Sequence, residues 1–422
     1  MNRMNRKLRM GCVRSVAALI LIAAGATRGH AQTGTAGNPG EWLTQYTSAR
    51  TLGLGGAFVA SADDALGVLW NPAGLARMDQ NQLRFETARL YEDTSINGFG
   101  LSVPGSRWPS VGLTMVSLTS GAFQRTNSLN DALGSFREGE TAYLFTIARN
   151  FSPRLALGAN VKLVQQTLES FSGGGYGVDV GGLANLTRDL RVGASIMNLG
   201  GPSITLRNTA EAWPSQMRGG MALTLLDGRA MLCAEIDHSQ GLGTRLRAGT
   251  EYRLISGLTL RVGYDDSRGA GGFSYRFTPQ YDLDYAVADH ALGMTHRVGV
   301  SYRFGGFFAS SRAEPSVFSP SGEHAVTRIS LNARTKGTPE TWSLEILDNA
   351  DRVVRRFGGQ GQPSSHIEWD GKDETGLPLA DGVYRYRLQV NDREGRVLES
   401  STRTIEISSG GPQGAVPVVP VP

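Results

Sequence analysis

Several short patterns combine residue types that could do chemistry. Asp370, Asp373 and Glu374 have the spacing of part of a calcium-binding loop, in which carboxylate oxygens ligate the ion. The glycine and the terminal glutamate of an EF-hand loop are missing, so we expect these carboxylates to hold a tight turn. The run Gly53-Leu54-Gly55-Gly56 imitates a dinucleotide-binding loop, but no buried strand of a parallel sheet precedes it.

Histidine and nucleophile patterns do not point to an active site either. The six histidines are dispersed, and His238, His290 and His296 lie at or near the ends of expected strands. The chain contains no HExxH motif, no Cys/His cluster and no nucleophile placed with its base. We therefore expect a protein that is not an enzyme and that uses no metal and no cofactor.

The N-terminus predicts export. Residues 1–31 have a basic start from Arg3 to Arg14, an apolar run from Val16 to Ala26, and a small-residue cleavage site, which together indicate a signal peptide. Its removal takes away six basic residues and no acidic ones, so the formal charge falls from +4 to −2. Nothing then suggests the clustered basic face that binds nucleic acid. Cys233 is the only cysteine left, which excludes an internal disulfide.

Most of the remaining chain alternates apolar and polar residues, the pattern of half-buried strands. No run of about 20 apolar residues follows the leader, so the chain would meet a membrane as strands. We expect about fourteen strands, at 82–91, 96–104, 109–119, 140–151, 154–168, 175–186, 189–199, 213–226, 229–239, 243–254, 257–265, 271–278, 281–289 and 293–304. Their lengths suit an all-β transmembrane barrel, and 55 glycines fit strands that bend and turn often.

The links between these strands favour the same interpretation. Long links at Ser120–Gly139, Glu169–Gly174 and Gly200–Trp213 alternate with tight ones such as Ser152-Pro153 and Thr187-Arg188. Outer-membrane barrels have short periplasmic turns and longer outer loops. The tight set shares one side with both ends of the predicted barrel, and an even strand count returns the chain to its starting side.

The two faces of the strands indicate which side meets lipid. In the last strand Val298, Val300, Tyr302 and Phe304 alternate with polar or small residues, so we expect the first set to face lipid. The polar lumen set that we expect is Asp179, Arg261, Asp282, Asp284, Arg297 and Arg303, joined by Glu235, Asp237, Arg245, Arg247, Glu251 and Arg253. A lumen with both signs of charge can pair its own charges, and a substrate-binding cluster is the alternative.

The stretch Arg50–Met78 ahead of the strands is apolar, glycine-rich and short. Ser61 and Asp64 form a capping-box-like start and Pro72 cannot continue a helix, so we expect a helix over Ala62–Leu69. So much apolar surface on a short segment needs a wall to bury it, and we expect the stretch to plug the barrel. The candidates for a hatch, gate or ligand contact are Phe58, Asp63, Asp64, Leu66, Leu69, Trp70, Asn71 and Pro72.

The order GLGGAFVASADDALGVLWNPAGLA resembles the N-terminal hatch of outer-membrane barrels of the FadL and PorV/PorQ type. Residues 177–181, 196–201 and 260–264 are similar to recurring strand segments of the same barrels, so the resemblance covers Ala49–Phe304. It implies uptake of hydrophobic compounds, as in FadL. The alternative is a scaffold or carrier role in an outer-membrane protein secretion system of the type IX kind, as in PorV.

A further segment follows the barrel. Residues 367–376 and 382–388 resemble the FlgD-type immunoglobulin-like domain, with Trp369, Asp370, Gly371, Asp373 and Gly376 in its turn. The expected domains are a signal peptide (1–31), a hatch (32–81), a barrel (82–308), a linker (309–323), a small β-sandwich (324–408) and a Pro/Val-rich tail (409–422). The implied partners are outer-membrane lipid, a hydrophobic ligand, and secretion-system proteins or cargo. We expect the sandwich on the periplasmic side.

Overall fold

The computed structural model describes residues 39–409, except 46, 107, 242, 256, 267, 290–292, 323–324 and 394–395. The predicted signal peptide and all but the first residue of the predicted tail lie outside the described residues. In the described part of the chain, no helix has both the length and the apolar character needed to span a membrane.

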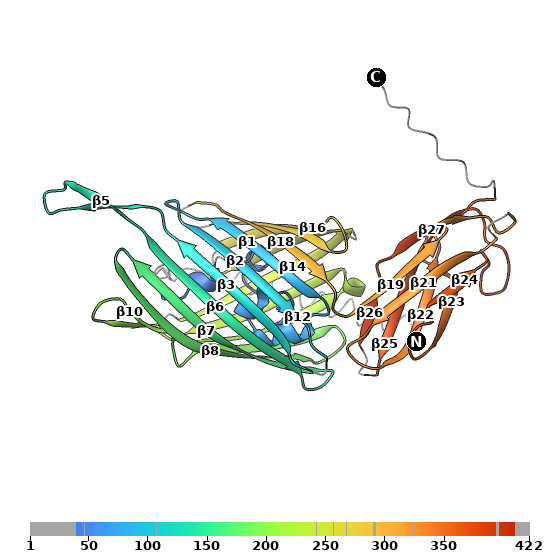
Figure 1. Ribbon diagram of the computed structural model, residues 1–422, viewed down its shortest axis with the longest axis horizontal. Helices are drawn as coiled ribbons and strands as arrows, with labels where there is room; N and C mark the ends of the chain where they lie inside the picture. The colour runs from blue at the N-terminus through green and yellow to red at the C-terminus, as the bar shows by residue number, and fades with distance from the viewer. Residues whose placement is uncertain are drawn as a thin grey trace, which may run out of the picture. The chain divides into compact units, whose positions relative to one another are not determined.

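Fourteen antiparallel strands close into a barrel (Figure 1), which confirms the predicted fold class. They are β1 (Asn81–Arg89), β2 (Ser95–Val103), β3 (Ser110–Thr119), β6 (Glu138–Asn150), β7 (Leu155–Leu168), β8 (Phe171–Asn185), β9 (Leu190–Leu199), β12 (Gln216–Leu225), β13 (Ala230–Ser239), β14 (Gly243–Ile255), β15 (Leu258–Asp265), β16 (Arg268–Arg276), β17 (Tyr281–Ala288) and β18 (Thr295–Phe304). Strand β1 closes the barrel by pairing with β18, with Asn81 opposite Phe304. Both ends of the barrel chain therefore lie at one rim, here called the terminal rim; the opposite end is the loop rim.

The barrel wall is apolar outside and polar inside. Val298 and Val300 are 40% and 44% exposed, whereas Arg297 between β17 and β1 is 1% exposed. Near the terminal rim the rings of Tyr281 and Tyr302 stack at 4.8 Å, which is typical of the aromatic girdle at a membrane interface. This alternation gives the wall a lipid-compatible outer surface, as in a transmembrane β-barrel.

The links differ from the predicted pattern at one place. The two long links carry small hairpins, β4 (Phe123–Thr126) with β5 (Ala132–Phe136), and β10 (Ser203–Thr205) with β11 (Ala210–Ala212). Both hairpins extend from the loop rim (Figure 1). The predicted long link Glu169–Gly174 is wrong, because Leu168 already pairs with Phe171 and Glu169 turns the chain with a φ of +57°.

The hatch occupies the lumen, as the blue segment inside the strands in Figure 1 shows. Its helical pieces are short: α2 (Trp42–Gln45), α3 (Ala49–Gly53), and the 3₁₀ turns η1 (Gly67–Leu69) and η2 (Pro72–Arg77). The predicted helix over Ala62–Leu69 is wrong except for its last turn.

Side chains compete for the amides that such a helix would need. The N–H of Ala65 donates to Oε1 of Gln82 on the barrel wall at 2.8 Å, and that of Leu66 donates to Oδ1 of Asp64 at 3.1 Å. Asn71 begins η2, because its Oδ1 accepts the N–H of Ala73. The hatch follows its wall rather than its own helix propensity.

The C-terminal module forms two sheets around its own core. One sheet contains β19 (Phe308–Glu314), β21 (Thr327–Arg334) and β24 (His366–Trp369). The other contains β20 (Val317–Phe318), β27 (Arg403–Ile407), β25 (Gly382–Asp392), β22 (Pro339–Leu347), β23 (Val353–Gln360) and β26 (Val397–Glu399). Trp369, Leu344 and Ile346 are fully buried between the sheets. The module is thus a small β-sandwich.

The structure differs from the predicted linker at 309–323. Strands β19 and β20 lie within it, and β19 begins only four residues after the barrel ends at Phe304. The N–H of Ala313 donates to the buried hydroxyl of Tyr386 on β25 at 2.8 Å, which ties β19 to the module. Serine and proline suggested a linker, but Ser311, Ala313 and Phe318 are buried.

This contact predicts the effect of a substitution in the module. Tyr386→Phe leaves the N–H of Ala313 buried without its acceptor, so we expect the module to lose about 1–3 kcal/mol of stability. Urea unfolding of the full chain in detergent, followed by near-ultraviolet circular dichroism, measures the loss. Tyr384→Phe is the matched control, since its hydroxyl donates to the carbonyl of the exposed Ala380, where water can replace it. An equal loss in both variants would contradict the role of Tyr386.

Candidate functional site

The centre of the lumen is an apolar cluster on the hatch. Phe58, Leu66, Leu69 and Trp70 are all buried and pack with wall residues in one core. The rings of Phe58 and Trp70 meet edge to face at 6.0 Å. The structure therefore brings together these four apolar candidates of the predicted hatch.

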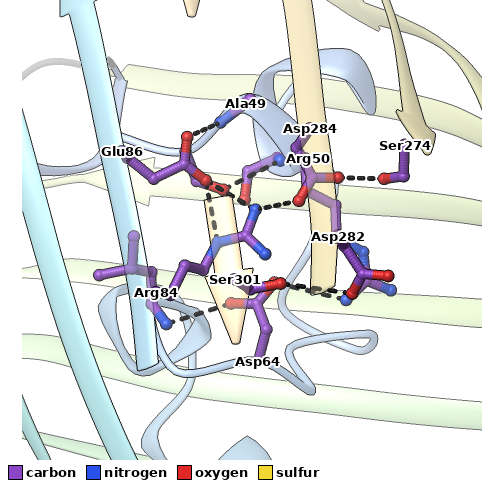
Figure 2. Close-up of polar contacts among 12 residues, drawn as sticks. Ala49, Arg50, Asp64, Arg84, Glu86, Ser274, Asp282, Asp284 and Ser301 are labelled. Atoms are coloured by element: carbon purple, nitrogen blue, oxygen red, sulfur yellow. Dashed lines mark hydrogen bonds and ion pairs between the residues drawn. The ribbon is translucent and has the colours of Figure 1, made fainter. Parts of the chain in front are cut away.

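Wall carboxylates hold the hatch by its backbone amides. Oε2 of Glu235 on β13 accepts the N–H groups of Phe58 and Val59 at 2.8 and 2.7 Å. Oε2 of Glu86 on β1 accepts the N–H of Ala49 at 3.1 Å (Figure 2). These bonds involve a charged acceptor, so each is stronger than an ordinary backbone bond.

Wall donors bind three successive hatch carbonyls. The carbonyl of Val68 accepts from Asn160 at 3.0 Å, that of Leu69 from Arg218 at 3.2 Å, and that of Trp70 from Ser195 at 2.7 Å. The donors come from β7, β12 and β9, so the wall grips this segment from three strands. The backbone that carries Leu69 and Trp70 has a fixed position as long as these bonds persist.

The Asn71-Pro72 turn is locked in the same way. The amide of Asn71 donates to the carbonyls of Val59 and Gly182 at 2.9 and 3.0 Å, so it joins two parts of the hatch to β8. Pro72 then begins η2, in which its missing N–H costs nothing.

Glycines of the wall make room for the hatch. A Cβ added at Gly158 would lie 2.5 Å from the carbonyl carbon of Pro72, and one added at Gly193 would lie 2.8 Å from Cα of Ala60. Gly249 and Gly263 face the hatch backbone in the same way, and Gly181 faces the side chains of Asn71 and Pro72. Sequence reasoning assigned glycine to bends and turns and missed this use. The positions of these glycines among the inward-facing residues of their strands could have indicated it.

An ionic network surrounds the apolar cluster. Arg50 of α3 pairs with Asp63, with Asp64 at 3.4 Å and with Glu251 of the wall at 3.4 Å. Arg84 lies between Glu86 at 2.6 Å and Asp284 at 2.8 Å (Figure 2). Arg50 thus links both acidic hatch candidates to β14, which gives the hatch an electrostatic as well as an apolar attachment.

The predicted lumen residues all lie on the inner face, and most of them pair with one another or with neighbours. Asp179 pairs with Lys162 at 2.9 Å, and Arg261 pairs with Glu251 at 2.7 Å and with Asp284 at 3.3 Å. Asp282 pairs with Arg276 and Arg303, and Arg297 is buried. Such mutual pairing favours a structural role over a substrate-binding cluster.

Sequence reasoning missed other lumen residues that touch the hatch or its ion pairs. They are Arg50, Arg84, Glu86, Asn160, Lys162, Ser195 and Arg218. Arg84 and Glu86 lie two and four residues after the inward-facing Gln82. The alternation of inward and outward residues along β1 therefore predicts that both face the lumen. Arg50 gave no such signal, because it lies outside the strands and its partner on the wall, Glu251, is 201 residues away in the sequence.

A small cavity of about 60 Å³ lies between the hatch and the wall near the loop rim. Thr51, Leu52 and Trp70 line it from the hatch, and Arg268 and Thr295 line it from the strand ends of the wall. Its volume holds only a few water molecules. Any larger molecule that passed this point would require the hatch to move.

The predicted turn of the module is held by its own carboxylates. Oδ1 of Asp373 accepts the N–H groups of Thr375 and Leu377, each at 2.9 Å, and the Thr375 hydroxyl as well. The hydroxyl of Thr375 and these backbone amides hold the pKa of Asp373 below its usual range. Gly371 and Gly376 take positive φ, and the indole of the buried Trp369 donates to the carbonyl of Lys372 at 3.0 Å.

Asp370 serves the same turn. Its Oδ1 accepts the N–H of Lys372 at 3.3 Å, and its Oδ2 pairs with the Lys372 ammonium at 3.0 Å. Across the described part of the chain, no group of three or more His, Cys, Asp or Glu side chains is arranged to hold a metal ion. These carboxylates therefore stabilise a turn.

Comparison with known proteins gives one family match and several solved structures that are similar to the barrel. Residues 320–395 match the FlgD Ig-like domain family, as predicted from the module's turn. Among solved structures, the Pseudomonas putida toluene transporter TodX is 16% identical over 61% of this chain and 97% of its own, with a TM-score of 0.48. The CymD monoaromatic hydrocarbon channel is 15% identical over 60% and 96%, with a TM-score of 0.46. A Pseudomonas aeruginosa FadL homologue is 12% identical over 61% and 98%, with a TM-score of 0.45. The comparison with curated proteins found no match.

Proposed function

We propose that this protein is an outer-membrane channel for small hydrophobic molecules, closed by the hatch in the state described above. The observation that carries the proposal is the apolar cluster of Phe58, Leu66, Leu69 and Trp70 held at the centre of a lipid-compatible barrel. A purely structural plug would not need its largest apolar side chains next to a cavity at the loop rim. Trp70 belongs to both the cluster and the cavity lining.

The proposed route begins at the loop rim. A small apolar molecule enters the cavity beside Leu52 and Trp70 and reaches the cluster when the hatch shifts. Apolar contacts favour such a ligand over a polar one of similar size, because a polar solute would lose its water without gaining partners.

The attachments of the hatch are suited to opening. The hydrogen bond that the N–H of Phe58 donates to Glu235, and the one that Arg218 donates to the carbonyl of Leu69, can be exchanged for bonds to water at modest net cost. The wall glycines then leave a smooth surface along which the hatch backbone can slide. Opening thus needs only movement of the hatch within an unchanged barrel.

A hatch-to-wall crosslink tests the proposal. Sγ of Cys233 on β13 lies 3.6 Å from Oγ of Ser61 on the hatch, so Ser61→Cys should form a disulfide that fastens the hatch. In cells without other channels of this kind, we expect the wild type to raise uptake of radiolabelled toluene. Oxidised Ser61→Cys should reduce uptake to background, and a reductant should restore it.

The matched control is Ser61→Cys with Cys233→Ser, which has the same hatch substitution but cannot crosslink. Its uptake should not depend on oxidation. Thiol titration of the purified protein verifies that the crosslink has formed. Equal uptake by the oxidised and reduced forms of the crosslinkable variant would refute a moving hatch as the gate.

A second candidate function is a scaffold in outer-membrane protein secretion, with the module as its docking unit. The observation that favours it is a sandwich with its own core and a match to the FlgD Ig-like domain. Truncation after Gly306 separates the two functions. A channel would keep toluene uptake, whereas a scaffold would lose secretion of its cargo.

A further inference from the structure

The tight turns of the terminal rim share a feature that the channel proposal does not use. Each carries a large apolar residue that is more than half exposed: Trp108, Phe151, Leu186, Leu226, Ile255 and Phe277. Among the described residues, exposed arginines that do not share the inward parity of the strands lie within three residues of Phe151, Leu186 and Leu226; they are Arg149, Arg154, Arg188 and Arg229. Arg253 and Arg276 instead have the parity of the lumen residues Glu251 and Ser274. The combination of an arginine with an apolar side chain thus recurs at three neighbouring turns, those between β6 and β7, β8 and β9, and β12 and β13.

None of these four arginines makes an ion pair with an acidic side chain among the described residues. A guanidinium group left exposed beside an apolar side chain is available to an external anion. This contrasts with the lumen, where charges of opposite sign are paired.

The loop rim has the opposite charge character. Its exposed or half-exposed acidic side chains include Glu92, Asp93, Asp131, Glu169, Asp266 and Asp289. Basic residues are fewer there, and Arg125 pairs with Glu169 at 2.5 Å. Acidic side chains therefore outnumber basic ones at the loop rim, whereas exposed arginines predominate at the terminal-rim turns, where Asp189 is an exposed acid.

We propose that the terminal rim is a collar that binds anionic phospholipid headgroups. Arginine recognises phosphate through its planar fork of donors, and an adjacent apolar side chain can enter the acyl region. Each turn at this rim joins two strands, so neighbouring turns lie about 10 Å apart, which is about the size of a lipid headgroup. Each headgroup can therefore meet one turn with its arginine and its apolar side chain. The collar follows an arc of consecutive wall strands from β6 to β13, which fits a bilayer leaflet better than a single protein partner.

This inference is independent of the channel proposal. It concerns the outer surface at the terminal rim, whereas the hatch and its cluster lie in the lumen. The collar would fix the depth of the barrel in the membrane and, with the acidic loop rim, its orientation between an inner leaflet of phospholipid and the outer surface.

Trp108 provides a natural reporter of the collar. It is 82% exposed, whereas Trp42, Trp70, Trp213, Trp342 and Trp369 are all buried. Strand β3, which begins just after Trp108, pairs with β6, so this tryptophan lies beside the turn with Arg149 and Arg154. Brominated lipids quench tryptophan on contact. The full-length protein in nanodiscs can thus report which lipid occupies this part of the rim.

We expect brominated phosphatidylglycerol to quench Trp108 with about fivefold higher relative affinity than brominated phosphatidylcholine. Raising the salt concentration should reduce the preference, since the contact is electrostatic. In Arg149→Gln with Arg154→Gln the ratio should fall to about one. The matched control is Arg89→Gln with Arg125→Gln at the loop rim, which should keep the fivefold ratio.

Several outcomes would overturn the collar. They are equal quenching by the two lipids in the wild type, a preference insensitive to salt, or a preference that the double substitution leaves intact. Millimolar glycerophosphate should not displace the lipid; full competition would show recognition of free phosphate instead of a membrane. The wild-type salt titration decides the question even if the double variant fails to assemble. Toluene uptake does not enter any of these measurements, so the channel proposal stands or fails separately.

Discussion

Deletion of residues 61–76 is expected to convert the closed barrel into an open pore. The deleted segment carries Leu66, Leu69 and Trp70 of the central cluster and the Asn71-Pro72 turn. Without it, the fourteen wall strands keep all their pairings, and water should fill the polar lumen. In planar bilayers we expect the conductance to rise by roughly tenfold or more over that of the intact protein.

The control removes a segment of similar length elsewhere. Deleting the hairpin Phe123–Phe136 takes away β4 and β5, which pair only with each other and do not contact the hatch core. That variant should conduct as little as the intact protein. If the hatch deletion conducted no better than the hairpin deletion, the hatch would not be what closes the pore. Heat-modifiable mobility on gels shows that both deletions still assemble as barrels.

The wall was largely predictable because its signal is local. Alternation with a period of two marks each strand, and every barrel strand overlaps the range predicted for it. The same parity sorted Val298 and Val300 outward and Arg297 inward. One face of each barrel strand meets lipid and the other meets the lumen. The alternation of residue types within a single strand is therefore enough to predict both faces.

The hatch was not predictable in the same detail because its partners are distant in sequence. Its amides at Phe58, Val59 and Ala65 bond to Glu235 and Gln82 of the wall rather than to hatch carbonyls. The helix and turn propensities of residues 61–76 carry no information about these acceptors on the wall. The sequence therefore located the plug and its apolar side chains, but it predicted a helix where the wall imposes turns.

The module shows a related limit. Its turn was recognised because Trp369, Asp370 and Asp373 act within one short segment. Strand β19 was taken for linker because its stabilising contacts, such as that of Ala313 with Tyr386, join residues far apart along the chain. Only Gly305, Gly306 and Phe307 separate β18 from β19. The barrel and the module are thus connected by a much shorter tether than composition suggested.

Because this connection is so short, the module must lie on the side of the membrane that the terminal rim of the barrel faces. An even strand count puts Phe304 at the same rim as Asn81, where the exported chain enters the barrel. If that rim faces the periplasm, three connecting residues span only about 10 Å, too little to carry the module across a bilayer about 30 Å thick. We therefore expect the module to be periplasmic.

Single cysteines with a membrane-impermeant maleimide test this expectation, because Cys233 is buried and should react slowly. Ser128 in the loop-rim hairpin and Ser364 in the module are both exposed serines, so Ser128→Cys and Ser364→Cys form a matched pair. In intact cells we expect strong labelling of Ser128→Cys and at least tenfold weaker labelling of Ser364→Cys, because the outer membrane excludes the reagent. Permeabilisation should make the two equal. Strong labelling of Ser364→Cys in intact cells would place the module outside, and the terminal rim, with its arginine collar, would then face the medium.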